Sequence, residues 1–220
     1  IENIYFASIN YCSLNCSNFF ENKYLKNIIN KKIKKILKYN FTYEELSINI
    51  INVISNYNIN IDNISLIIAS SFILEAILYL YQFKKNTTNY DNIYTYIINK
   101  STQSKEYTDI LNKLIQSKNL KNSKYELKDF IKSKDNIMKD TIIIDYNNMD
   151  NNNNKLNILN ILHRSLKQLN KNGDIVIYIK KINSKYYYDI FNYIGTIFNK
   201  INILFNKFNR TLYFYIIYKN

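Results

Sequence analysis

From residue 61 onward, the chain alternates between short apolar runs and longer stretches with helical spacing. Residues 63–69, 141–145 and 174–180 are runs rich in isoleucine, a residue that favours strands. Stretches with apolar residues three and four positions apart separate these runs, which is typical of helices. Because parallel strands need crossover connections, this alternation favours an α/β fold, with a mostly parallel sheet and helices on both faces.

The chain is expected to end differently. Its last two apolar runs, residues 201–206 and 211–219, are separated by a linker too short for a crossover, so they should pair as an antiparallel hairpin. Further strands are expected over residues 92–99 and 123–130, and helices over 72–83, 105–116, 155–169 and 186–198. Gly173, which follows Asn172, is expected to supply a left-handed residue where the 155–169 helix ends.

The first 60 residues have a different pattern. Residues 17–39 place apolar side chains at three- and four-residue spacing opposite several lysines, which predicts a basic amphipathic helix. Thr42 precedes Glu45 by three residues, a capping-box pattern that predicts a second helix to about residue 57. We therefore expect a helical extension over residues 1–60 and an α/β domain over residues 61–220.

The balance of charge favours a polyanionic partner. The chain has 30 basic and 17 acidic residues, for a formal net charge of +13, which favours a polyanion such as RNA, DNA or an acidic membrane surface. Part of this lysine content has another explanation, because isoleucine, asparagine, lysine and tyrosine are the residues that an AT-rich genome encodes. The charge alone therefore leaves a solvated basic surface open as the alternative.

Cysteine and histidine are scarce. Cys12, Cys16 and a distant His163 cannot supply the four ligands of a structural zinc site, so no metal is expected. Two cysteines in a basic chain suggest a reducing compartment such as the cytoplasm, although a disulfide between them stays open.

One apolar run, residues 64–81, is nearly long enough to cross a bilayer as a helix. Glu75 lies within it, and Ser70 and Ser71 divide a β-rich first half from a second half with helical spacing. We expect a buried strand followed by a core helix and no membrane contact. A single membrane-spanning helix is the alternative, and it would contradict the α/β prediction.

Two charged residues stand where a ligand is expected. In an open parallel sheet, ligands bind at the carboxyl ends of the strands. Asp145 ends one predicted strand and Lys180 ends another, so the same edge of the sheet should hold both. A neighbouring carboxylate and ammonium could orient and deprotonate a hydroxyl group. An ordinary turn aspartate and a solvated lysine are the structural alternatives.

The order of elements and the last 48 residues together resemble a known family. Residues 173–220 contain a glycine, a strand ending in Lys180, a helix, a strand, a linker with Lys207 and Arg210, and a strand carrying Tyr215. This arrangement is similar to the end of the FtsJ-like RNA ribose 2′-O-methyltransferases. The resemblance implies a Rossmann-like methyltransferase fold, S-adenosylmethionine as cofactor and RNA as substrate, with Lys207 and Arg210 binding RNA.

The resemblance also implies site residues. The family uses a Lys-Asp-Lys-Glu set, of which Asp145 and Lys180 match the two central members and Lys26 matches the first. The final acidic position falls on Tyr213 or Phe214. The cofactor turn corresponds to Ala69, Ser70, Ser71 and Phe72, and here it contains no glycine. The second strand ends in Asn99 and Lys100 instead of a ribose-binding acid.

Two functions follow from this pattern. The first is an S-adenosylmethionine-dependent RNA methyltransferase, acting on a cap or another ribose. The second is a non-catalytic methyltransferase-like subunit, similar to the small subunit of poxvirus-type mRNA capping enzymes, which binds RNA and supports a capping or methyltransferase protein. The second requires the pocket to be filled, for which Phe72 and Leu74 are the candidates.

Overall fold

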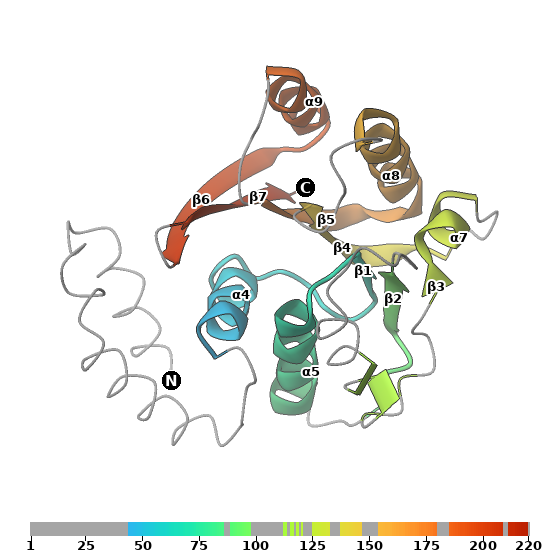
Figure 1. Ribbon diagram of the computed structural model, residues 1–220, viewed down its shortest axis with the longest axis vertical. Helices are drawn as coiled ribbons and strands as arrows, with labels where there is room; N and C mark the ends of the chain where they lie inside the picture. The colour runs from blue at the N-terminus through green and yellow to red at the C-terminus, as the bar shows by residue number, and fades with distance from the viewer. Residues whose placement is uncertain are drawn as a thin grey trace.

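The described residues fold around one seven-stranded sheet, shown in the computed structural model of Figure 1. The structure describes residues 44–85, 89–97, 112–113, 115–116, 118, 120, 125–132, 137–146, 154–179, 185–208 and 211–219. The helices are α4 (Glu44–Asn56), α5 (Ser71–Lys85), α7 (Leu127–Lys132), α8 (Asn154–Gln168) and α9 (Lys185–Gly195). The strands are β1 (Ile64–Ile67), β2 (Ile93–Ile97), β3 (Tyr125–Glu126), β4 (Lys139–Asp145), β5 (Leu169–Ile179), β6 (Lys200–Phe208) and β7 (Thr211–Lys219).

The strand order is β3-β2-β1-β4-β5-β7-β6. The strands β3, β2, β1, β4 and β5 pair in parallel, whereas β7 is antiparallel to both β5 and β6. The predicted fold class is confirmed, including the antiparallel hairpin at the end of the chain. The order reverses between β1 and β4, so a ligand is expected beside the carboxyl ends of these two strands.

Helices cover both faces of the sheet. One core joins buried side chains of α4 and α5 to one face, and Ile50, Ile54, Ile73 and Ile77 are among its fully buried members. The other core joins α7, α8 and α9 to the opposite face, through residues such as Phe130, Ile158 and Phe191. Because both faces are covered, β1 is buried along its whole length and β4 at every position except Asp140, instead of alternating between buried and exposed residues.

The end of α4 shows how a chain with only two glycines makes a tight helix terminus. Asn58 adopts the left-handed conformation, with φ of 49°. The amide of Ile59 donates to the carbonyl of Ile54 and the amide of Asn58 donates to that of Ser55, which is the Schellman pattern. Ile54 and Ile59 are both buried in the same core, so the turn directs the chain into β1.

Three sequence expectations can be compared directly with these elements. Residues 64–81 form a strand and a separate helix, β1 and α5, so the single membrane-spanning helix is wrong. No helix within the described ranges is long and apolar enough to span a bilayer. The strand expected over residues 123–130 is wrong beyond Glu126, because Leu127, Phe130 and Ile131 have helical spacing and form α7.

The role predicted for Gly173 is also wrong. The helix α8 ends at Gln168 and β5 begins at the next residue, and Gly173 lies within that strand without a positive φ. A Cβ atom at Gly173 would lie 2.7 Å from Cγ of Leu169 and 2.9 Å from the carbonyl oxygen of Asp140. Glycine is therefore needed for the close approach of β5 to the irregular start of β4.

Several predictions lie outside the described residues. These are the helix over residues 17–39, most of the helix over residues 105–116, and the side chains of Lys26, Lys180, Lys207 and Arg210. The division at residue 60 stays a prediction. What the structure shows nearby is that α4 shares its core with β1 and α5.

Candidate functional site

The candidate site lies at the turn between β1 and α5, beside the carboxyl end of β4. Ser70 is the residue before α5, and its carbonyl accepts hydrogen bonds from the amides of Ile73 and Leu74. This geometry explains why the apolar run stops being a strand here, since serine favours the position that begins a helix. The turn therefore ends β1 and begins α5 within four residues.

Asp145 closes this turn instead of facing solvent. Its side chain is fully buried, and its Oδ2 accepts a hydrogen bond of 3.1 Å from the amide of Ser70. The same oxygen accepts a second hydrogen bond from the hydroxyl of Ser70. A carboxylate at the first turn of α5 also interacts favourably with the helix dipole. Asp145 thus links the end of β4 to the start of α5.

Ile68 carries backbone strain in the same turn. Its φ is 57°, a left-handed value that is unusual for a residue branched at Cβ. Its amide donates a 2.8 Å hydrogen bond to the carbonyl of Tyr96 in β2, and its side chain is buried against the second core. The backbone therefore keeps a conformation suited to glycine while the side chain fills apolar space.

Aromatic side chains occupy the other flank of the turn. The ring of Phe72 meets that of Tyr178 edge-on, with centroids 5.5 Å apart. Tyr178, in β5, packs in turn against Tyr215, in β7, with ring centroids 4.9 Å apart. All three side chains are buried in the first core. Pairs of this kind add about 0.5–1.5 kcal/mol beyond the burial of their area.

The structure places the predicted site residues as follows. Asp145 and the turn residues Ala69, Ser70, Ser71 and Phe72 come together where β1, β4 and α5 meet, and all five are buried. The strands β4 and β5 are parallel neighbours, and Asp145 pairs in register with Tyr178, two residues before Lys180. Lys180 itself lies beyond the described end of β5. The catalytic and RNA-binding roles stay predictions.

The residues present in the turn do not fit S-adenosylmethionine, the cofactor that the resemblance implies. A turn that holds a nucleoside cofactor brings its backbone close to the ligand, which glycine permits because it has no Cβ. Here the turn residues are buried among their own neighbours, and Phe72 packs into the core. The amide and hydroxyl of Ser70 are bonded to Asp145.

The buried acid of α5 has a structural explanation. Glu75 lies on the side of α5 that faces α4, and its Oε2 accepts a 3.1 Å hydrogen bond from the hydroxyl of Ser47. This contact joins the two helices that cover one face of the sheet. Within the described ranges, no three histidine, cysteine, aspartate or glutamate side chains are grouped as metal ligands.

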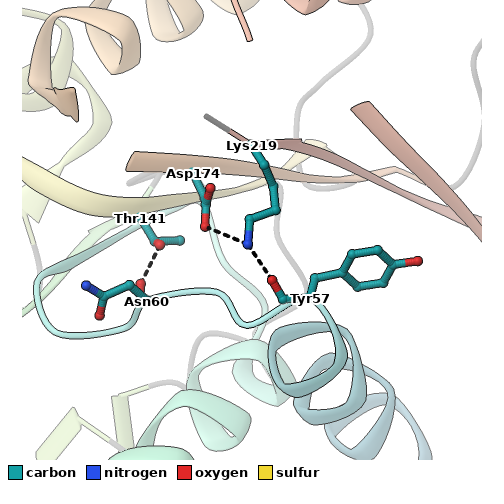
Figure 2. Close-up of polar contacts among 5 residues, drawn as sticks. All are labelled: Tyr57, Asn60, Thr141, Asp174 and Lys219. Atoms are coloured by element: carbon teal, nitrogen blue, oxygen red, sulfur yellow. Dashed lines mark hydrogen bonds and ion pairs between the residues drawn. The ribbon is translucent and has the colours of Figure 1, made fainter. Parts of the chain in front are cut away.

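A second polar cluster lies at the opposite, amino edge of the parallel strands (Figure 2). Nζ of Lys219 lies 3.8 Å from Oδ2 of Asp174 and also donates to the carbonyl oxygen of Tyr57, just past the end of α4. Burial raises the pKa of Asp174, and the nearby Lys219 opposes that rise. The hydroxyl of Thr141 donates to the carbonyl oxygen of Asn60. These contacts hold the α4–β1 loop against the sheet.

Lys139 lies at the same amino edge. Its side chain is buried, and Nζ donates a 3.0 Å hydrogen bond to Oδ1 of Asn63 and lies 3.0 Å from the centroid of the Tyr94 ring. Burial lowers the pKa of Lys139 to about 7, and the neighbouring Asp140 opposes that shift. A cation over an aromatic ring is a favourable arrangement in such surroundings.

Sequence reasoning missed two features of the site. The first is the left-handed conformation of Ile68, which the sequence signalled only as the absence of glycine after an apolar strand. The second is the pairing of Ser70 with Asp145, whose members are 75 positions apart. Ser70 is explained locally as the start of a helix and Asp145 as the end of a strand, so no spacing pattern in the sequence could predict that they contact each other.

The chain matches no protein-family model and no curated protein. It is similar to the solved structure of a methyltransferase from Pyrococcus furiosus, with a TM-score of 0.53 and 14% identity, over 90% of this chain and 98% of that one. It is also similar to precorrin-6y C5,15-methyltransferase from Geobacter metallireducens GS-15, with a TM-score of 0.53 and 12% identity, over 82% and 90%. It is similar, too, to the METTL16 methyltransferase domain, with a TM-score of 0.51 and 13% identity, over 82% of this chain and 70% of that one. The chain therefore has the Rossmann-like fold of these methyltransferases.

Proposed function

We propose that this chain is a methyltransferase-fold protein that does not transfer methyl groups itself, but binds RNA and supports an RNA-modifying enzyme. The observation that carries the proposal is the engagement of Asp145. The carboxylate expected to position a ribose hydroxyl is fully buried and accepts two hydrogen bonds from Ser70. A general base or positioning group must reach the proton it acts on, which this geometry prevents.

The buried turn supports the same proposal. Ile68 fills apolar space where glycine would suit the backbone, and Phe72 packs against Tyr178 instead of lining an opening. Loss of the cofactor turn leaves the sheet intact, because the same side chains now belong to its two cores. Selection for a stable scaffold that presents its surface to a partner would retain this arrangement.

The RNA part of the proposal depends on charge. A net charge of +13 favours a polyanion, and the resemblance assigns the linker residues Lys207 and Arg210 to RNA. The same resemblance suggests the class of the protein partner, a capping enzyme or a methyltransferase. The alternative, an active S-adenosylmethionine-dependent RNA methyltransferase, has the fold in its favour.

The experiment measures methyl transfer and RNA binding on the same purified chain. Radiolabelled S-adenosylmethionine is supplied with capped and uncapped RNA, and RNA affinity is measured over a series of salt concentrations. We expect no transfer to either RNA and a steep salt dependence of binding. Transfer that is lost in Lys180→Ala would contradict the non-catalytic part of the proposal.

Matched variants separate the predicted RNA linker from general charge. Replacing Lys207 and Arg210 with alanine should lower the log–log salt slope by about 0.7 units per lost contact with single-stranded RNA. The control replaces Lys132 and Lys171, two exposed lysines away from the linker, and removes the same charge. Equal slopes for both double variants would contradict a role for the linker in RNA binding.

A further inference from the structure

The two edges of the sheet differ in length. The edge strand β3 has two residues, whereas β6 has nine and pairs with β7 along its whole length. In the described part of the chain, no strand lies beyond β6, which Figure 1 shows at the outer end of the sheet with α9 above it. A long edge strand presents backbone amides and carbonyls that can pair with another strand.

Exposed apolar side chains gather at this long edge. Ile197, Ile201 and Ile203, which we call the edge patch, are 53%, 41% and 49% exposed. Ile201 and Ile203 pair in register with Tyr218 and Ile216 of β7, which belong to the core under α9, so both lie on the α9 face of the sheet. Ile201 also contacts the end of α9, where its Cδ1 occupies the space that a Cβ atom at Gly195 would need.

The middle of β6 lacks the charges that normally protect an edge strand. Residues 201–206 contain no charged side chain and no proline, and the two lysines of the strand, Lys200 and Lys207, lie near its ends. Two copies that pair through the middle of the strand therefore keep these lysines apart.

We propose that the occupant of this edge is a second copy of the chain, joined by antiparallel pairing of two β6 strands about a two-fold axis. A register centred on Asn202 places Ile201 of each copy opposite Ile203 of the other. Lys200 then lies opposite Leu204, so no lysine faces a lysine. The axis also brings the two α9 helices to the same side of the joined sheet, where the two edge patches cover each other.

The first test is sedimentation equilibrium of the full chain over a wide range of protein concentration. The average mass should approach twice that of one chain, and added salt should not dissociate the dimer because the facing side chains at its centre are apolar. Ile203→Lys should raise the dissociation constant by about tenfold or more, because it replaces an apolar contact with a charge opposite Ile201 of the other copy. Leu159→Lys, at a 43% exposed position on α8, is the matched control and should have no effect.

Contrary outcomes are clear. A single-chain mass at all concentrations would overturn the proposal and leave the edge to a different partner or to another segment of the chain. A dimer that survives Ile203→Lys, or one that salt dissociates, would place the interface elsewhere. Circular dichroism of the Ile203→Lys chain should match that of the unchanged protein, because the side chain it replaces is half exposed.

A cross-link tests the register independently. Across an antiparallel pair, facing Cα atoms lie about 4.5–5.5 Å apart, within the range that a disulfide spans. In a background of Cys12→Ser and Cys16→Ser, oxidation of Asn202→Cys should give a covalent dimer. Asn160→Cys, at an exposed position on α8, should not. Equal cross-linking at both positions would overturn the β6 interface.

Discussion

The carboxyl and amino edges of the parallel strands place their polar groups differently. At the carboxyl edge, the acid of β4 is fully buried and bonded to the turn before α5, and aromatic rings pack alongside. At the amino edge, Lys139 and Asp174 are buried groups whose pKa values are shifted. Shifted pKa values usually gather at functional sites, and ligands usually bind at carboxyl ends. Here the two signals lie at opposite edges.

The two edges therefore use their polar groups differently. Among the described residues of the carboxyl edge, Asp145 pairs with Ser70 inside the core. At the amino edge, Lys219, Thr141 and Lys139 hold the α4–β1 loop and the start of β4 in place. The groups with shifted pKa values that we describe there make structural contacts.

The largest expected effect comes from Phe72→Ala at the carboxyl edge. If the turn is core, removing this ring should lower the free energy of unfolding by about 3–4 kcal/mol. The control is Phe83→Ala on the same helix, at a side chain that is 53% exposed, with an expected change within about 0.5 kcal/mol. Denaturant unfolding measures both, and equal effects would show that Phe72 is not a core residue.

Matched aspartate substitutions compare the two edges directly. Asp145→Ala leaves the amide and hydroxyl of Ser70 buried without this acceptor and should destabilise by about 2–3 kcal/mol. Asp174→Ala, at the amino edge, should cost less than about 1 kcal/mol, because its ion pair with Lys219 is long and partly exposed. The comparison fails if urea unfolding gives the two variants the same stability.

The strain at Ile68 predicts an inverted glycine effect. Alanine is normally more stable than glycine within a strand, and Ile67→Gly should be less stable than Ile67→Ala by about 0.5–1 kcal/mol. At position 68, with φ of 57°, Gly should instead be more stable than Ala by about 1 kcal/mol. Thermal unfolding of the four variants measures both differences. The ordinary order at position 68 would mean that the turn is unstrained.

A pH dependence is expected at the amino edge. The pKa of Lys139 is about 7 in the folded protein, against 10.5 ordinarily, so between these values the unfolded chain binds a proton that the folded chain lacks. The free energy of unfolding should therefore rise as pH rises from about 7 to 10.5, and lose that gain as pH falls back to about 7, below which this lysine adds no further change. Lys139→Met should flatten the profile in urea titrations. An unchanged profile would assign the pH dependence to other groups.

The fold could be predicted far better than the site. Isoleucine-rich runs such as residues 141–145 specify buried strands wherever they occur, and helical spacing specifies what covers them, so sheet and layers followed from local patterns. The prediction for Gly173 was wrong because glycine permits both a left-handed backbone and a close approach of two strands. Only the packing of Leu169 and Asp140 around it shows that the close approach is the reason here. The hydrogen bond from Ser70 to Asp145 is a tertiary contact. It could not be predicted, because each residue is already explained locally, Ser70 as the start of a helix and Asp145 as the end of a strand.

We propose that the carboxyl edge does not bind S-adenosylmethionine, and calorimetric titration of the full chain with this ligand measures that binding. No binding heat is expected at millimolar ligand, either for the unchanged chain or for Asp145→Asn, which keeps the shape of the acceptor. Circular dichroism confirms that each chain is folded. Saturable binding at low-micromolar concentration would contradict this proposal if a substitution at Ser71 or Phe72 in the turn weakens it. Such binding would favour the alternative, an active methyltransferase.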